Sequence, residues 1–103
     1  MLTELARHRD RIADLCRRHH VARLEVFGSA ARGHDFDPMR SDADFLVEFV
    51  DGGGFTPLEQ VFGLRAELEK LLSRPVDLIE AGAVSNPYIL AEIDRAREVL
   101  YAA

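Results

Sequence analysis

A strongly marked helix between two short apolar runs restricts the fold more than any other feature of this chain. Thr56-Pro57-Leu58-Glu59 is a capping box with proline at the first helical position, which predicts a helix start here. We expect the helix to extend to about Ser73, because Pro75 lies just beyond it. The apolar runs 45–50 and 76–80 are predicted strands. The expected buried side of the helix consists of Leu58, Val61, Phe62, Leu64, Leu68, Leu71 and Leu72.

The remaining segments add further helices and strands around this unit. Residues 3–20 carry an apolar stripe typical of a helix, and residues 21–27 (VARLEVF) are a predicted strand. Residues 29–32 could form a short helix, residues 86–97 a last helix and residues 99–101 a short edge strand. This order predicts an α/β (α+β) fold with a small mixed sheet of three to four strands and helices packed mainly on one face.

Size and composition exclude several classes of protein. The 103 residues suit one domain, 1–103, and the net charge of −5 argues against direct binding of nucleic acid or of an anionic membrane. Cys16 is the only cysteine, so no internal disulfide can form and we expect a cytoplasmic protein. No apolar run approaches the roughly 18 residues of a membrane span.

Two aspartates lead directly into the strand at 45–50. In Ser41-Asp42-Ala43-Asp44 the alternation of a strand would place Asp42 and Asp44 on one face, with Cα atoms roughly 6–7 Å apart. Carboxylates in such a pair suit Mg²⁺, which prefers a few carboxylates together with substrate phosphates. The alternative is that Asp42 caps a loop and that Asp44 is a strand start facing solvent.

A third aspartate, Asp77, lies within the apolar strand at 76–80. Burying it without a partner would be costly. If this strand pairs with the strand at 45–50, Asp77 joins Asp42 and Asp44, and three carboxylates can hold two Mg²⁺ ions about 4 Å apart. Asp77 would then contact the second ion or accept the proton of an attacking hydroxyl group. The alternative is an edge-strand aspartate that faces water.

Gly28-Ser29 follows the strand at 21–27 and precedes the possible helical turn. A glycine at this point lets the backbone approach a ligand closely, and N–H groups at a helix start suit a phosphate group. The alternative is an ordinary turn.

Taken together and in this order, the motifs resemble the nucleotidyltransferase superfamily that includes DNA polymerase beta. More closely, the chain resembles the minimal nucleotidyltransferase (MNT) antitoxins over nearly its whole length. The segments that carry the resemblance are 27–33 (FGSAARG), 41–49 (SDADFLVEF), 74–79 (RPVDLI) and 86–88 (NPY). The stretch 30–41, between Gly28-Ser29 and the aspartate pair Asp42 and Asp44, is slightly longer than is usual in the family.

The resemblance implies a substrate, a metal and a set of site residues. ATP would be the substrate, and two Mg²⁺ ions the cofactors. The implied residues are Gly28 and Ser29 at the phosphates, Arg32 as added charge at the triphosphate, and the catalytic and metal-binding carboxylates Asp42, Asp44 and Asp77. For Arg32, a plain surface arginine is the alternative.

The resemblance also implies a partner. Because the chain ends at 103, soon after the sheet, we expect another molecule to supply the acceptor surface. In the family that molecule is a HEPN-domain RNase toxin, which is inactivated when AMP is moved from ATP onto one of its tyrosines. Two alternatives stay open: an antitoxin that acts by binding alone, and a subunit of a small-molecule nucleotidyltransferase. A homodimer or a hetero-oligomer is expected, because so small a domain leaves apolar surface exposed.

Overall fold

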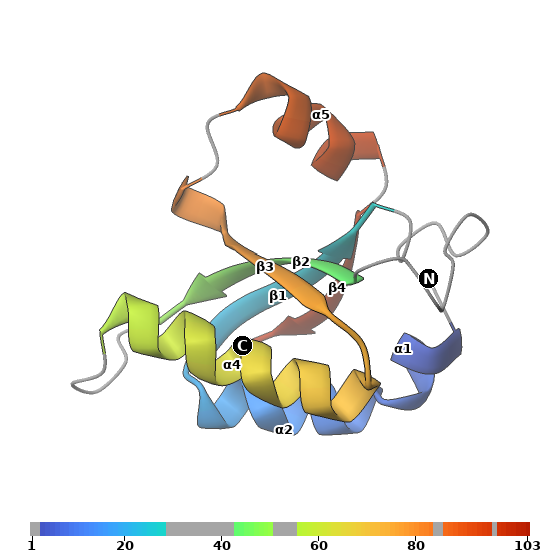
Figure 1. Ribbon diagram of the computed structural model, residues 1–103, viewed down its shortest axis with the longest axis vertical. Coiled ribbons are helices and arrows are strands. Elements are labelled where there is room, and N and C mark those ends of the chain that lie inside the picture. The colour runs from blue at the N-terminus through green and yellow to red at the C-terminus, as the bar shows by residue number, and fades with distance from the viewer. Residues whose placement is uncertain (1–2, 29–42, 51–55, 84–85, 96) are drawn as a thin grey trace.

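The computed structural model describes residues 3–28, 43–50, 56–83, 86–95 and 97–103. Four strands form one sheet in the order β3-β2-β1-β4 (Figure 1). Their bounds are Val21–Phe27 for β1, Ala43–Phe49 for β2, Val76–Glu80 for β3 and Arg97–Ala102 for β4. Strand β1 is antiparallel to both β2 and β4, whereas β3 is parallel to β2. The predicted mixed sheet is thereby confirmed, and its last strand is longer than the expected 99–101.

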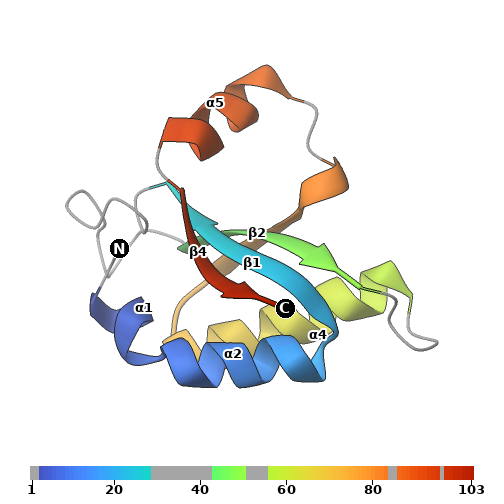
Figure 2. The same ribbon diagram turned by 180° about the vertical axis from the view of Figure 1, so that it is seen from behind.

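Helices lie on both sides of this sheet. Their bounds are Thr3–Arg7 for α1, Arg9–Arg18 for α2, Pro57–Leu72 for α4, Pro87–Arg95 for α5 and, for the 3₁₀ helix η1, Ala81–Ala83. Helices α2 and α4 cover one face, and α5 lies beyond the opposite face, as the two opposed views show (Figures 1 and 2). The helix expected over 3–20 is divided into α1 and α2, and the short helix expected over 29–32 lies outside the described residues. Among the helices described, none is both long and apolar enough to cross a membrane.

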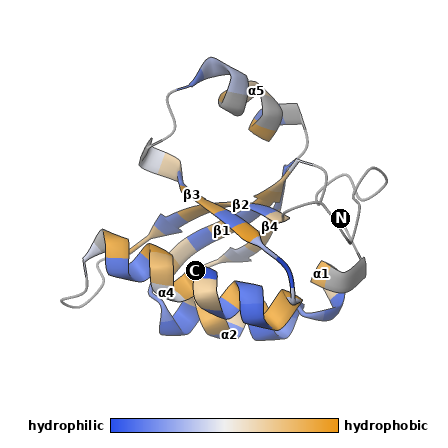
Figure 3. Ribbon diagram, viewed as in Figure 1, coloured by the Kyte–Doolittle hydropathy of each residue, from blue (hydrophilic) through white to orange (hydrophobic). Residues whose placement is uncertain are grey.

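The main hydrophobic core lies between the sheet and the helices α2 and α4. Figure 3 shows apolar and polar segments alternating along both helices. The core includes Ile12, Leu15 and Cys16 from α2, Leu24 and Val26 from β1, Phe45 and Val47 from β2, and Leu64, Leu68 and Leu72 from α4. Ala43 and Phe45 of β2 therefore point into this core. Asp44, which lies between them, points to the side of the sheet on which α5 lies.

Helix α4 begins as the sequence predicts, but its buried side differs from the expectation. The Thr56 hydroxyl accepts a hydrogen bond from the Glu59 backbone N–H at 3.1 Å, and the Thr56 N–H donates to the Glu59 carboxylate at 3.2 Å. However, Leu58 is 64% exposed and Phe62 is 56% exposed. The buried row follows the four-residue spacing of Gln60, Leu64, Leu68 and Leu72, from which positions 58 and 62 are displaced by about half a turn.

This correction predicts a contrast between two leucines of the same helix. Leu68→Ala should lower the free energy of unfolding by about 2–5 kcal/mol, because Leu68 is fully buried and its loss leaves a cavity. Leu58→Ala should change it by less than about 0.5 kcal/mol, because Leu58 is mostly exposed. Urea unfolding of both variants measures the contrast, and equal losses would contradict the orientation of α4.

Candidate active site

Two of the three predicted carboxylates lie side by side on neighbouring strands. Asp44 of β2 and Asp77 of β3 are register partners in the parallel ladder. Neighbouring strands are about 4.8 Å apart, and residues directly opposite each other point to the same face. Asp44 is half-buried, and Asp77 is exposed. The pairing of these two strands, on which the predicted cluster depended, is therefore present.

Two hydrogen bonds at the start of β3, one between backbone groups and one to a side chain of α4, hold this register. The Ala43 N–H donates to the Pro75 carbonyl oxygen at 3.2 Å, at the point where the two strands begin to pair. The Val76 N–H donates to the Glu69 carboxylate of α4 at 3.1 Å. Because side chains alternate along a strand, a slip of one residue would turn Asp77 into the core. These contacts therefore position the carboxylate pair.

Gly28 brings backbone against one of the two carboxylates. It follows β1 with a φ of +70°, a conformation that L side chains rarely adopt. A Cβ atom at this position would lie 3.0 Å from Asp44 Oδ2. Phe27, the residue before it, is the register partner of Asp44. The end of β1 is thus shaped so that the turn touches the Asp44 carboxylate.

The other predicted site residues, Ser29, Arg32 and Asp42, lie outside the described residues. Asp42 is adjacent in sequence to Ala43, the first residue of β2. Within the parts of the chain that the structure describes, no group of three or more His, Cys, Asp or Glu side chains could hold a metal ion. The described geometry therefore concerns Gly28, Asp44 and Asp77.

An ion-pair cluster around one buried glutamate, which the sequence analysis did not identify, lies beside these residues. Glu25 of β1 is 2% exposed, and Arg97 of β4 donates to its carboxylate from Nε at 2.6 Å and from Nη2 at 3.0 Å. Arg23 Nε also donates to it, and Arg97 Nη1 donates to Asp94 of α5 at 3.3 Å. The hydrogen bonds from Arg97 hold the pKa of Glu25 below its usual value. A glutamate among the apolar residues of 21–27 was the available signal.

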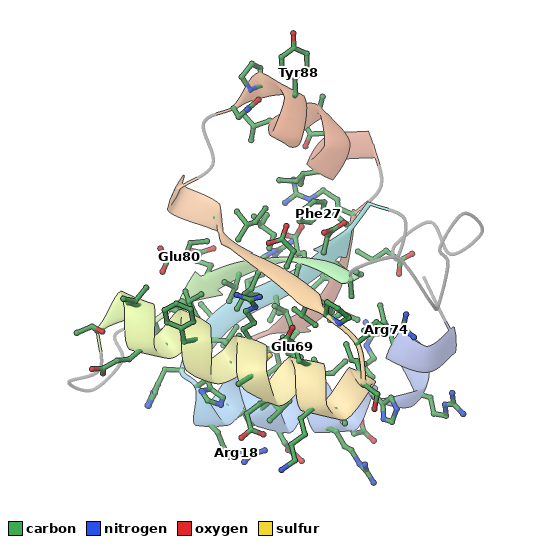
Figure 4. All side chains as sticks on the ribbon, in the orientation of Figure 1. Arg18, Phe27, Glu69, Arg74, Glu80 and Tyr88 are labelled. Atoms are coloured by element: carbon green, nitrogen blue, oxygen red, sulfur yellow. The ribbon has the colours of Figure 1, made fainter. Side chains whose placement is uncertain are left out.

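The cluster and the carboxylate pair share one row across the sheet. Register partners run from Asp77 to Asp44, then to Phe27, and then to Arg97. The side chains of this row point away from the core, toward the side on which α5 lies, and Figure 4 shows Phe27 between the sheet and α5. The row therefore has carboxylates on β2 and β3 and a guanidinium group on β4.

Other features of the molecule are less suited to chemistry. Cys16 is buried in the core, and burial raises the pKa of its thiol to about 12, so the reactive thiolate does not form near neutral pH. Two hollows, of about 360 and 310 Å³, lie around α2 and α4, on the opposite side of the sheet from the carboxylates. We therefore place the candidate active site at Gly28, Asp44 and Asp77.

Comparison with known proteins identifies the family. Residues 9–100 match the nucleotidyltransferase domain family. The chain belongs to this family. A relative from Methanocaldococcus jannaschii, named "Putative protein adenylyltransferase", is 33% identical over 90 residues, which cover 87% of this chain and 84% of the relative.

Solved structures place this nucleotidyltransferase in the minimal branch of the family. A structure described as a minimal nucleotidyltransferase is 34% identical, with a TM-score of 0.72 and 95% of each chain covered. Two structures share the fold at lower identity. One is a toxin–antitoxin complex with AMP-PNP, at 21% identity and a TM-score of 0.68, covering 92% of this chain and 73% of that chain. The other is a tri-AMPylated Shewanella oneidensis HEPN toxin with its MNT antitoxin, at 18% identity and a TM-score of 0.65, covering 96% and 73%. The expected family and the class of enzyme are thereby confirmed.

The contact between Gly28 and Asp44 predicts that a single methyl group added at position 28 destabilises this nucleotidyltransferase. Gly28→Ala should lower the free energy of unfolding by about 1–3 kcal/mol, because alanine is strained at this φ and its Cβ would meet Asp44 Oδ2. Gly82→Ala is the control, since nothing lies within 4 Å of a Cβ at that position. Chemical denaturation of both variants measures the difference. An effect of Gly28→Ala no larger than that of Gly82→Ala would contradict the close approach.

The ion-pair cluster around Glu25 predicts a dependence of stability on pH. Glu25→Gln should lower the free energy of unfolding at pH 7 by about 1–3 kcal/mol, because charge-assisted hydrogen bonds are lost. The folded-state pKa of Glu25 is lowered, so its stabilisation is fully present above about pH 4.3, the ordinary glutamate pKa. It is lost as the pH falls through the lower folded-state pKa. Urea unfolding from pH 7 to pH 3 should show the difference between parent and variant shrinking only below about pH 4.3. A constant difference would contradict this role.

Proposed function

We propose that this protein is a Mg²⁺-dependent protein adenylyltransferase that moves AMP from ATP onto a tyrosine of a HEPN-domain toxin and so acts as its antitoxin. The observation that carries the proposal is the register of Asp44 with Asp77 beside Gly28. Two carboxylates on one face next to a backbone turn form an arrangement that can receive a metal-bound triphosphate.

The residues present fit a divalent cation. Asp44 and Asp77 offer hard oxygen donors from adjacent strands, and the missing Cβ of Gly28 leaves space against Asp44 Oδ2. With Asp42 they would form the ligand set for two Mg²⁺ ions. Bound there, the metal would neutralise phosphate charge and polarise the α-phosphate group.

The chain's own residues would bind the nucleotide and handle the proton. Backbone N–H groups at Gly28 and Ser29 would bind the phosphates, with Arg32 adding charge at the triphosphate. Asp77 is exposed and can accept the proton of the attacking hydroxyl group. Loss of that proton makes the hydroxyl oxygen a better nucleophile.

The partner proposed is a HEPN toxin in the cytoplasm. Support comes from the relative named as a protein adenylyltransferase and from the shared fold of the antitoxins bound to such toxins. Val50, Leu58 and Phe62 are large apolar side chains that are 47–64% exposed, which suits contact with another protein. AMP on the toxin would add bulk and negative charge, and both would oppose RNA binding.

Removal of one carboxylate tests the proposal. Asp44→Asn and Asp77→Asn should each lower AMP transfer roughly a hundredfold or more, because a charged metal ligand is lost. Both variants should stay as stable as the parent, because repulsion between neighbouring carboxylates is relieved. Transfer is measured with α-³²P-labelled ATP and a purified HEPN-domain toxin as the acceptor, with and without MgCl₂. Stability is measured by thermal unfolding.

The matched control is Asp14→Asn, which removes an exposed aspartate of α2 that pairs with Arg17. It should leave transfer unchanged. A toxin that is silenced without carrying AMP would instead identify an antitoxin that acts by binding alone. A toxin that stays active and unmodified would leave a small-molecule acceptor.

A further inference from the structure

A small hollow of about 150 Å³ lies on the same face of the sheet as the carboxylate pair. It lies on the side of the sheet that α5 overlies, away from the core. Side chains of β1, β2 and β4 and the start of η1 line it, among them Arg23, Glu25, Leu46, Glu48, Ala81 and Arg97. None of these residues belongs to the nucleotide or metal site argued above, so the hollow requires its own explanation.

The hollow and the Gly28 turn lie on opposite sides of the carboxylate row. Leu46 follows Asp44 by two residues on β2, so it points to the same face roughly 7 Å further along the strand. Glu25, the register partner of Leu46, precedes Phe27 by two residues on the antiparallel strand. Gly28 lies at the other end, after Phe27. The carboxylates therefore lie between the turn and the hollow.

This order matters because phosphoryl transfer proceeds in line. The attacking oxygen and the leaving oxygen lie on opposite sides of the phosphorus atom. The next step rests on the proposed function, in which Gly28 and Ser29 bind the triphosphate. Pyrophosphate would then leave on the side of the turn, and the acceptor hydroxyl would approach from the side of the hollow.

The lining of the hollow suits an aromatic ring. Leu46 supplies apolar surface, and the guanidinium groups of Arg97 and Arg23 are fixed by hydrogen bonds to Glu25. A guanidinium group held along its edge keeps its flat faces for stacking on an aromatic ring. The volume admits one side chain rather than a whole nucleotide. We propose that this hollow receives the tyrosine side chain of the acceptor protein, with its ring against Leu46 and the guanidinium group of Arg97.

The reaction that this placement implies is balanced without any further reactant. The phenolic oxygen forms a bond to the α-phosphorus of ATP, and the bond from that phosphorus to the bridging oxygen of pyrophosphate breaks. Pyrophosphate leaves, and the phenolic proton passes to the Asp77 carboxylate. A serine side chain has no aromatic ring to pack against Leu46 or to stack on Arg97. The hollow would therefore select tyrosine over serine.

Binding of a model acceptor tests the hollow separately from catalysis. The full chain, labelled at its leucine and alanine methyl groups, is titrated with N-acetyl-tyrosinamide or N-acetyl-serinamide and followed by NMR. Tyrosinamide should shift the methyl signals of Leu46 and Ala81, whereas serinamide should not. Leu46→Trp, which fills the hollow, should weaken tyrosinamide binding at least tenfold as read from Ala81. Equal responses to both amides, or unmoved signals, would overturn the proposal.

Two further comparisons separate this inference from the proposed function. Arg97→Gln should raise the KM for the toxin acceptor at least fivefold without changing the KM for ATP. The control Arg17→Gln also removes an arginine that pairs with a carboxylate and lies over a tyrosine ring, 5.9 Å from its centre. It should change neither value. If the proposed function alone fails, tyrosinamide binds but receives no AMP. If the hollow alone fails, AMP reaches the toxin, and neither Leu46→Trp nor Arg97→Gln alters acceptor use.

Discussion

Strand β3 can run parallel to β2 only because a helix carries the chain back across the sheet between them. A parallel connection needs such a crossover, and α4 supplies it. The end of α4 also enters the hydrogen bonding of β3, since Glu69 accepts the N–H of Val76. The capping box at the start of α4 and the contact at its end therefore bear on where Asp77 lies relative to Asp44. The candidate site follows from this crossover.

The crossover places two like charges side by side, which is unfavourable unless a cation or a proton lies nearby. Such an arrangement does not stabilise a fold, and carboxylates so placed are typical of sites that bind a charged ligand. The row ends on the opposite side in Arg97, whose charge is already matched by Glu25 and Asp94. The charge of Arg97 therefore helps to hold β4 and α5 at this face of the sheet.

Much of this arrangement is readable from the sequence because its signals are local. Periodicity and turn residues predict the start of α4, the strands near 45–50 and 76–80 and the final edge strand. The structure differs in that β2 begins two residues earlier than expected. The exposure of Leu58 and Phe62 was missed because apolar residues surround much of α4, and their pattern does not tell which row faces the sheet. Asp42, Ser29 and Arg32 lie outside the described residues. The catalytic and binding roles of all six predicted site residues stay predictions.

Long-range pairing explains why the Glu25 cluster could not be predicted. Arg97 is 72 residues away from Glu25, and the two meet only because β4 returns to lie beside β1. A single buried glutamate in a strand does not reveal which cation matches it.

Once the pairing of the strands is known, the two faces of the sheet can be told apart. The face covered by α2 and α4 holds the apolar core, and the face toward α5 holds every charged group of the row. Side chains on that second face can therefore change while the core beneath them keeps its packing, so the chemistry of the face can vary on an unchanged fold.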